Sequence, residues 1–214
     1  MTKKQKRWIL AGLVCILAAV LWFVTVPVKV DVSTGLAANG ALLSKEGSLD
    51  AHWMVPQLQN GKDGALVPAH VVADDSQDHY GDWLDDGPKS DWIALTAKHA
   101  DDNGPAPYTF SRPLSLWGFV RPTLEVDGKW AIDDAGTLNL NGHQLAVIQP
   151  CNGCNVSSNW NHFHPFAATV ADFNPAGDVL SMTITYSDEY CEGVRLEGEL
   201  TGRERLFAYL IRLL

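Results

Sequence analysis

"GTLNLNGHQLAVI", residues 136–148, is the stretch that decides the predicted fold class. From Thr137 to Leu140 polar and apolar side chains alternate, which is the period of a strand with one buried face. Asn141 and Gly142 follow, and both tolerate the positive φ angles of a two-residue type I′ turn. A second apolar segment comes directly after them. The stretch therefore predicts a β-hairpin.

Segments on both sides of this hairpin also have the period of a strand. "DVLSMTITYSD", residues 178–188, alternates most clearly. The other predicted strands lie within residues 108–119, 123–133, 166–173 and 193–202. Strands at this spacing, separated by turn residues, are typical of an antiparallel sandwich or barrel. We expect a mainly β domain over residues 67–202.

The N-terminal segment is of a different kind. Residues 8–28 contain no charged side chain, and about 20 apolar residues in a helix cross about 30 Å of hydrocarbon. Trp8 and Trp22 fall towards its two ends, where indole rings favour the headgroup level. We expect a transmembrane helix over residues 8–28. A cleaved signal peptide is the alternative, although its apolar region is usually shorter.

The charges before this segment predict its orientation. Residues 1–7 contain four of the basic residues, and basic residues favour the cytoplasmic side of a membrane. They are Lys3, Lys4, Lys6 and Arg7. We therefore expect a single-pass protein of a bacterial inner membrane, with residues 1–7 cytoplasmic and the main domain periplasmic.

Two further segments flank the predicted β domain. Residues 29–66 are rich in Gly, Ala, Ser and Asn with weak periodicity, which predicts a linker or irregular extension. Residues 203–214, "RERLFAYLIRLL", predict a short amphipathic helix. Its apolar stripe comprises Leu206, Phe207, Leu210, Leu213 and Leu214. This stripe needs a contact with the domain itself, the membrane surface or another protein.

Charge narrows the classes of function. Of the 16 Lys and Arg, five lie before residue 31, whereas all 25 acids follow that point, so the exported part carries 11 minus 25, or −14. Such an acidic domain is a poor candidate for binding nucleic acid. The sequence also has no nucleophile elbow, no HExxH and no Gly-rich phosphate loop. We therefore expect no enzyme.

Three runs of sequence resemble the galactose-binding-like jelly roll. They are "SDWIALTAKHADDNGPAPYTF", "GKWAIDDAGTLNLNGHQLA" and "HFHPFAATVADFNPAGDVLSMTITYSDEYCEGVRLEGELTG", in that order. The matching positions are Trp92, Tyr108, Phe110, Trp130, Asp133, Asp134, Leu140, Asn141, Gly142, Pro165, Phe166, Gly177, Leu180, Gly193, Arg195 and Glu197. The likeness covers roughly residues 80–202, and its motifs describe turns, core aromatics and alternation.

The resemblance implies an antiparallel jelly-roll β-sandwich that is commonly non-catalytic. Such modules bind sugars or proteins through loops at one end of the sandwich, and occur as sugar-binding domains of glycoside hydrolases and in secreted bacterial proteins. The resemblance also implies a structural calcium near the early loops. Asp82, Asp85, Asp86 and Asp91 are the candidate ligands, because calcium prefers several oxygen ligands. Solvated turns are the alternative for these acids, and no other cofactor is expected.

Cys151, Cys154 and Cys191 are the cysteines outside the membrane segment. In an oxidising compartment a disulfide is the default, here joining Cys191 to Cys151 or Cys154. The alternatives are a zinc site that adds His162 or His164, because three Cys and one His form a known tetrahedral set, and a redox pair.

Trp83 and Trp160 fall in predicted loops. Their rings are candidates for stacking on a sugar or for a protein contact, as are the neighbouring side chains of His162 and His164. Packing within the loops is the alternative. The resemblance implies that Trp92 and Trp130 lie in the core.

These expectations leave two classes of function. The first is a structural or assembly subunit of a larger membrane protein complex, in which the membrane helix and the C-terminal helix contact other subunits or the lipid bilayer. The second is a carbohydrate-binding module of the cell envelope that uses Trp83 and Trp160.

Overall fold

The computed structural model describes residues 2–43, 45–59, 62–72, 83–85, 87–96, 107–133, 135–150, 159–174, 177–186 and 193–214. Its helices are α1 (Lys3–Phe23) and α2 (Leu206–Arg212), with short 3₁₀ turns η1 (Arg121–Thr123) and η2 (Val170–Asp172). Its strands are β1 (Thr25–Asp31), β2 (Leu49–Gln59), β3 (Lys62–Val71), β4 (Ile93–Ala94), β5 (Tyr108–Leu114), β6 (Glu125–Asp133), β7 (Ala135–Leu140), β8 (His143–Ile148), β9 (His164–Ala168), β10 (Asp178–Tyr186) and β11 (Gly193–Arg205). The prediction of a mainly β chain with one helix at each end is confirmed.

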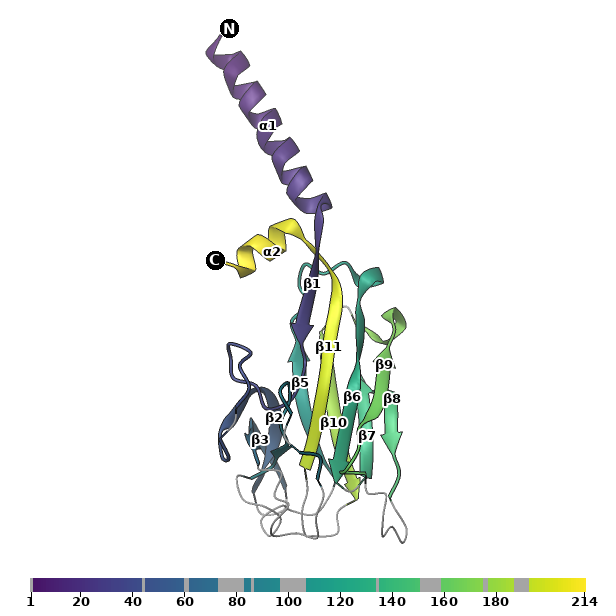
Figure 1. Cartoon of the computed structure of the whole chain (residues 1–214). Coiled ribbons are helices and arrows are strands. Elements are labelled where there is room, and N and C mark those ends of the chain that lie inside the picture. Colours follow the sequence, from purple (N-terminus) through teal and green to yellow (C-terminus); the bar gives the residue numbers. More distant parts are fainter. Residues whose placement is uncertain are drawn as a thin grey trace.

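Within the described residues the strands form one antiparallel sheet that nearly closes on itself (Figure 1). Its order is β8-β7-β10-β5-β2-β3-β4-β11-β6-β9, and β1 pairs with β11 outside this path. β8 and β9, the two ends of the path, contact each other. The apolar faces of the strands therefore enclose a common interior.

The predicted hairpin forms between β7 and β8. Asn141 has φ 55° and Gly142 has φ 80°, the two positive values that a type I′ turn requires. The Asn141 side chain accepts from the Val179 amide at 3.0 Å and donates to Asp178 at 2.7 Å. This turn is thereby joined to the start of β10, which pairs with β7.

The core contains three fully buried indoles. Trp53, Trp92 and Trp130 each have 0% of their surface exposed, which confirms the core positions expected for Trp92 and Trp130. Burying each such ring removes about 150–250 Å² from water. Trp53 belongs to the main core, whereas Trp92 belongs to a smaller cluster.

The first helix differs from the predicted span of 8–28. It begins at Lys3, where Thr2 and Gln5 form a capping box, and ends at Phe23. The next residues are largely β-branched and include Pro27, which cannot continue a helix. They form β1 instead, with Val28 facing the core.

The prediction of an irregular extension over residues 29–66 is wrong for much of its length. The end of β1, β2 and the first half of β3 lie there. Trp53 and Val55 alternate onto the buried face of β2, and Ala69 and Val71 do the same on β3. Burial of these side chains outweighs the low strand propensity of the surrounding residues.

The second helix is shorter than residues 203–214. Arg203, Glu204 and Arg205 remain in β11, because they pair with Pro27, Val26 and Thr25 of β1. The helix begins only after this ladder ends, at Leu206.

Candidate functional site

The end of the domain nearest α1 carries exposed apolar side chains from three parts of the chain. We call this set the apolar end surface: Trp22, Phe23, Trp117, Phe207, Leu210, Ile211, Leu213 and Leu214. α2 lies across this end beside the point where α1 leaves the domain (Figure 1). α1 is long and apolar enough to cross a membrane, and none of its residues is buried.

The junction between α1 and the sheet contains a single residue, Val24. The ladder of β1 with β11 starts immediately after it, at the pair of Thr25 with Arg205. The Val24 carbonyl accepts from the Leu206 amide at 2.9 Å, and Arg203 donates to the Thr25 hydroxyl at 2.8 Å. The membrane-sized helix is therefore fixed to the domain without a linker.

α2 is held in place by contacts with the loop before η1. The Arg212 guanidinium donates to the buried carboxylate of Glu204 at 2.7 Å. Trp117 and Phe207 meet edge to face with ring centroids 6.4 Å apart. A hollow of about 230 Å³ lies among these rings and Trp22. Only Ala208 of α2 is buried. The expected apolar stripe is exposed at Phe207, Leu210, Leu213 and Leu214, whereas its fifth member, Leu206, is half-buried.

A glycine lets the chain approach α2. Gly118 has φ +87°, and a Cβ placed on it would lie 2.1 Å from the Cβ of Ala208. We expect Gly118→Ala to lower the free energy of unfolding by about 2–4 kcal/mol, the sum of an unfavourable φ and overpacking. Gly40→Ala is the matched control, since its φ is +79° with no atom nearby. Equal losses in denaturant melts of the two variants would contradict tight packing at Gly118.

The opposite end holds the candidate sugar-binding aromatic residues. Trp83 stacks on Trp92 with ring centroids 4.3 Å apart, and its indole N–H donates to Asp133 at 2.8 Å. Trp160 packs into the same cluster, and its carbonyl accepts from the Leu84 amide at 2.9 Å. Both rings are only half-exposed. The structure thus brings Trp83 and Trp160 together, but uses their faces in packing.

A buried arginine occupies the loop where calcium was expected. Arg195 is 2% exposed and donates to the carbonyls of Leu84 at 3.0 Å and Asp85 at 2.6 Å, and to the Ser90 hydroxyl at 3.0 Å. Asp91 is buried, and its carboxylate accepts from the Trp92 amide. The Asp85 side chain is exposed. The other two candidates, at positions 82 and 86, lie outside the described residues.

We expect metal removal to leave the fold around Arg195 unchanged, because its guanidinium already supplies a positive charge to the carbonyls of Leu84 and Asp85. A bound ion stabilises a protein by mass action, so its removal lowers the melting temperature. Melting curves of the full chain with EDTA and with added calcium should coincide. A higher melting temperature with calcium would support the calcium site that the resemblance implies.

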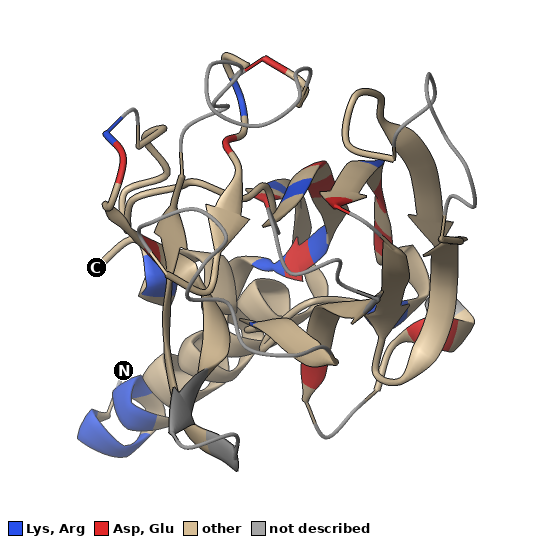
Figure 2. Ribbon diagram, turned by 90° about the horizontal axis from the view of Figure 1, so that it is seen from below, with Lys and Arg blue, Asp and Glu red and all other residues tan. Residues whose placement is uncertain are grey.

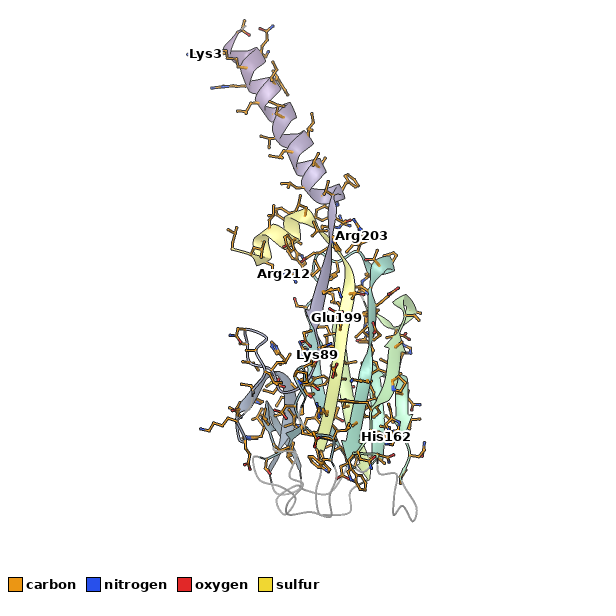
Figure 3. All side chains as sticks on the ribbon, in the orientation of Figure 1. Lys3, Lys89, His162, Glu199, Arg203 and Arg212 are labelled. Carbon is orange, nitrogen blue, oxygen red and sulfur yellow. The ribbon has the colours of Figure 1, made fainter. Side chains whose placement is uncertain are left out.

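His162 and His164 lie at the same end of the domain as Trp160, with ring centroids 4.3 Å apart (Figure 3 labels His162). Burial lowers the pKa of His164 below its usual 6.5, and the charge of His162 acts in the same direction. As the pH falls, the unfolded chain therefore takes up a proton on this imidazole at a higher pH than the folded protein does. The contribution of neutral His164 to the free energy of unfolding is complete above pH 6.5 and is lost as the pH falls below that value.

We expect His164→Gln to flatten the fall in stability below pH 6.5, because it removes the group whose protonation differs between the two states. Urea melts at several pH values measure this slope. His143→Gln is the control, since His143 is exposed on β8 and outside this pair. An unchanged slope in His164→Gln would exclude the imidazole as its source.

A charged groove on the outer face of β6 and β11 has no counterpart in the sequence predictions. It has a volume of about 610 Å³, and Gly128 and Gly198 lie directly opposite each other along it. The Glu197 carboxylate lies 3.3 Å from the Lys129 ammonium and 3.7 Å from the Lys89 ammonium. The Glu197 carboxylate is thus paired with two ammonium groups within the groove.

The expected cysteine chemistry falls outside the described residues. Cys151, Cys154 and Cys191 all lie there, so the disulfide, the zinc site and the redox pair stay predictions. Among the described residues, no group of three or more His, Cys, Asp or Glu is placed to hold a metal ion.

The chain was also compared with known proteins. No protein-family model matches its sequence, and no curated protein matches it.

Proposed function

We propose that this protein is a non-catalytic, single-pass membrane protein whose β domain serves as a structural subunit of a larger membrane complex. Residues 1–7 lie in the cytoplasm and the domain in the periplasm of a bacterial cell. The basic residues before the apolar part of α1, blue in Figure 2, support this orientation.

The observation that carries this proposal is the junction at Val24. A domain that captures free ligands gains reach from a flexible tether. A subunit that binds neighbours both in the bilayer and above it gains from a fixed spacing, because the second contact then forms at a high effective concentration. The hydrogen-bonded ladder from Thr25 to Asp31 provides that fixed spacing.

We also propose that the sheet is a jelly roll of the galactose-binding-like type. Trp92, Phe110, Trp130 and Leu180, four of the positions that carry the resemblance, are fully buried, as scaffold positions should be. The sugar-binding role is not proposed with it, because the rings of Trp83 and Trp160 pack in the loop cluster and offer less face for stacking.

Purification of the full chain from its own membranes in mild detergent tests the assembly role. We expect the protein to migrate with other membrane proteins at constant ratios, identified by mass spectrometry. A monomer that carries no other protein, at several detergent concentrations, contradicts the proposal.

A further inference from the structure

We propose that α2 and the rings beside it form an interfacial membrane-binding surface, and that its occupant is the headgroup region of the bilayer from which α1 emerges. This inference rests on the proposed function in one respect, the insertion of α1 in a membrane. It does not require a partner subunit.

The position of α2 follows from its attachment to the end of α1. The Leu206 amide donates to the carbonyl of Val24, the residue directly after α1, at 2.9 Å. The Arg205 guanidinium lies 4.0 Å from the centre of the Trp22 ring. α2 therefore starts at the depth where α1 leaves the hydrocarbon, and it runs across the direction of α1 (Figure 1).

The side chains of α2 fall into a set that packs on the domain and an exposed apolar set, as in a helix that lies at the surface of a membrane. Ala208 is buried against the domain, and Tyr209 packs partly against the core. The outward side chains, Phe207, Leu210 and Ile211, are exposed, and Leu213 and Leu214 beyond the helix are more so. An apolar face at the membrane boundary is buried about 5–10 Å into the boundary between headgroups and acyl chains.

The aromatic rings and the charged side chains around α2 are of the kinds that favour the headgroup region of the bilayer. Trp22 and Trp117 are exposed beside it, and indole rings favour the headgroup region. Arg203 and Arg212 lie at this end of the domain (Figure 3), together with Arg205. The one acid among them, Glu204, is buried and paired with Arg212. The segment 203–212 is thus basic on an otherwise acidic domain, as anionic headgroups favour.

The size of the surface favours lipid over protein. α2 has seven residues, which gives it a length of about 10 Å at 1.5 Å per residue. A stable protein interface buries about 1,200–2,000 Å², more than one face of such a helix offers. The bilayer is also the medium that must lie beside Phe23, the last residue of α1, which is 80% exposed.

Photo-crosslinking at position 210 distinguishes lipid from protein. Benzoylphenylalanine replaces Leu210 in the full chain, expressed in its own membrane, and irradiated material is analysed by mass spectrometry. The same probe at Leu66, an exposed apolar position on β3, is the control. We expect phospholipid adducts at position 210 and none above background at position 66. Protein adducts at position 210, or lipid adducts no more frequent than at position 66, overturn the proposal.

Vesicles separate this inference from the assembly role. The purified 210 probe variant is reconstituted into vesicles of phosphatidylcholine and phosphatidylglycerol, where no partner protein exists. Lipid adducts in these vesicles support the proposed membrane-binding surface, even if no complex with partner proteins is ever purified. With the probe moved to Phe207, the added changes Leu210→Asp and Leu213→Asp should lower adduct yield about tenfold, since two buried apolar contacts are lost. Equal yields would contradict insertion of α2.

Discussion

Replacing Arg195 by Met lowers the free energy of unfolding by about 3 kcal/mol. The change removes the donor to two partly buried carbonyls and the buried Ser90 hydroxyl, and an unsatisfied buried group costs about 1–3 kcal/mol. Part of the loss is offset, because Met no longer requires a charge to be buried. In a domain of this size, the melting temperature should fall by about 6–12 °C.

Lys89→Met is the matched control for this result. Lys89 is a cation of the same loop, but its side chain is 71% exposed and lies 3.7 Å from Glu197. An exposed pair of this kind contributes about 0–1 kcal/mol. Arg195→Lys should fall between the two, since one ammonium group cannot match the fork geometry of a guanidinium. If Arg195→Met has the melting temperature and the free energy of unfolding of the wild type, Arg195 does not stabilise the loop that contains Leu84, Asp85 and Ser90.

Insertion of a short Gly-Ser linker between Val24 and Thr25 abolishes co-purification of partner subunits. The insertion leaves α1 and the ladder of β1 with β11 intact, but it frees the domain to move relative to the helix. If α1 and the domain both bind one complex, losing the fixed spacing lowers the effective concentration at which the second contact forms. A second contact made at high effective concentration raises the overall affinity about 10²–10⁴-fold. Quantitative mass spectrometry of mild-detergent preparations measures the retained partners.

The same linker inserted after Gly40 is the control. Gly40 lies in a turn where no atom is within 4 Å of its Cβ position, so the domain tolerates extra residues there. Melting curves should show that both insertion variants are folded. Partners retained equally by the two variants would contradict a role for the rigid junction.

The hairpin between β7 and β8 was predictable because its signals are local. Alternation over four residues and an Asn-Gly pair determine its period and turn, without reference to the rest of the chain. The register shift between Leu138 and Asn139 gave no such local signal. Trp92 and Trp130 were expected in the core only from the resemblance to the galactose-binding-like family, and both are fully buried.

The boundary between α1 and β1 was not predictable in the same way. Residues 24–28 carry no charge and therefore fit the length of a membrane segment, whereas Pro27 and the β-branched side chains around it fit a strand. Only the pairing with β11, some 170 residues later in the chain, decides between them. The alternation of Trp53 with Val55 was a usable signal for β2, but the turn residues around it obscured the pattern.

The apolar end surface was predictable in part. The stripe on α2 is visible in the sequence, but whether it faces the domain depends on tertiary contacts. The close approach of Gly118 to Ala208, together with the Arg212–Glu204 pair and the Trp117–Phe207 contact, holds the helix in this orientation. Trp117 gave no signal of its own, because its role depends on the position of Phe207.

Hydrogen exchange of the full chain in lipid nanodiscs tests most directly whether the domain is fixed to the membrane helix. The peptide covering residues 25–31 should be protected to the same degree as the peptide covering residues 199–205 of β11, because the two segments share one ladder. Exchange of residues 25–31 at the rate of an unstructured linker, with β11 still protected, would contradict the account.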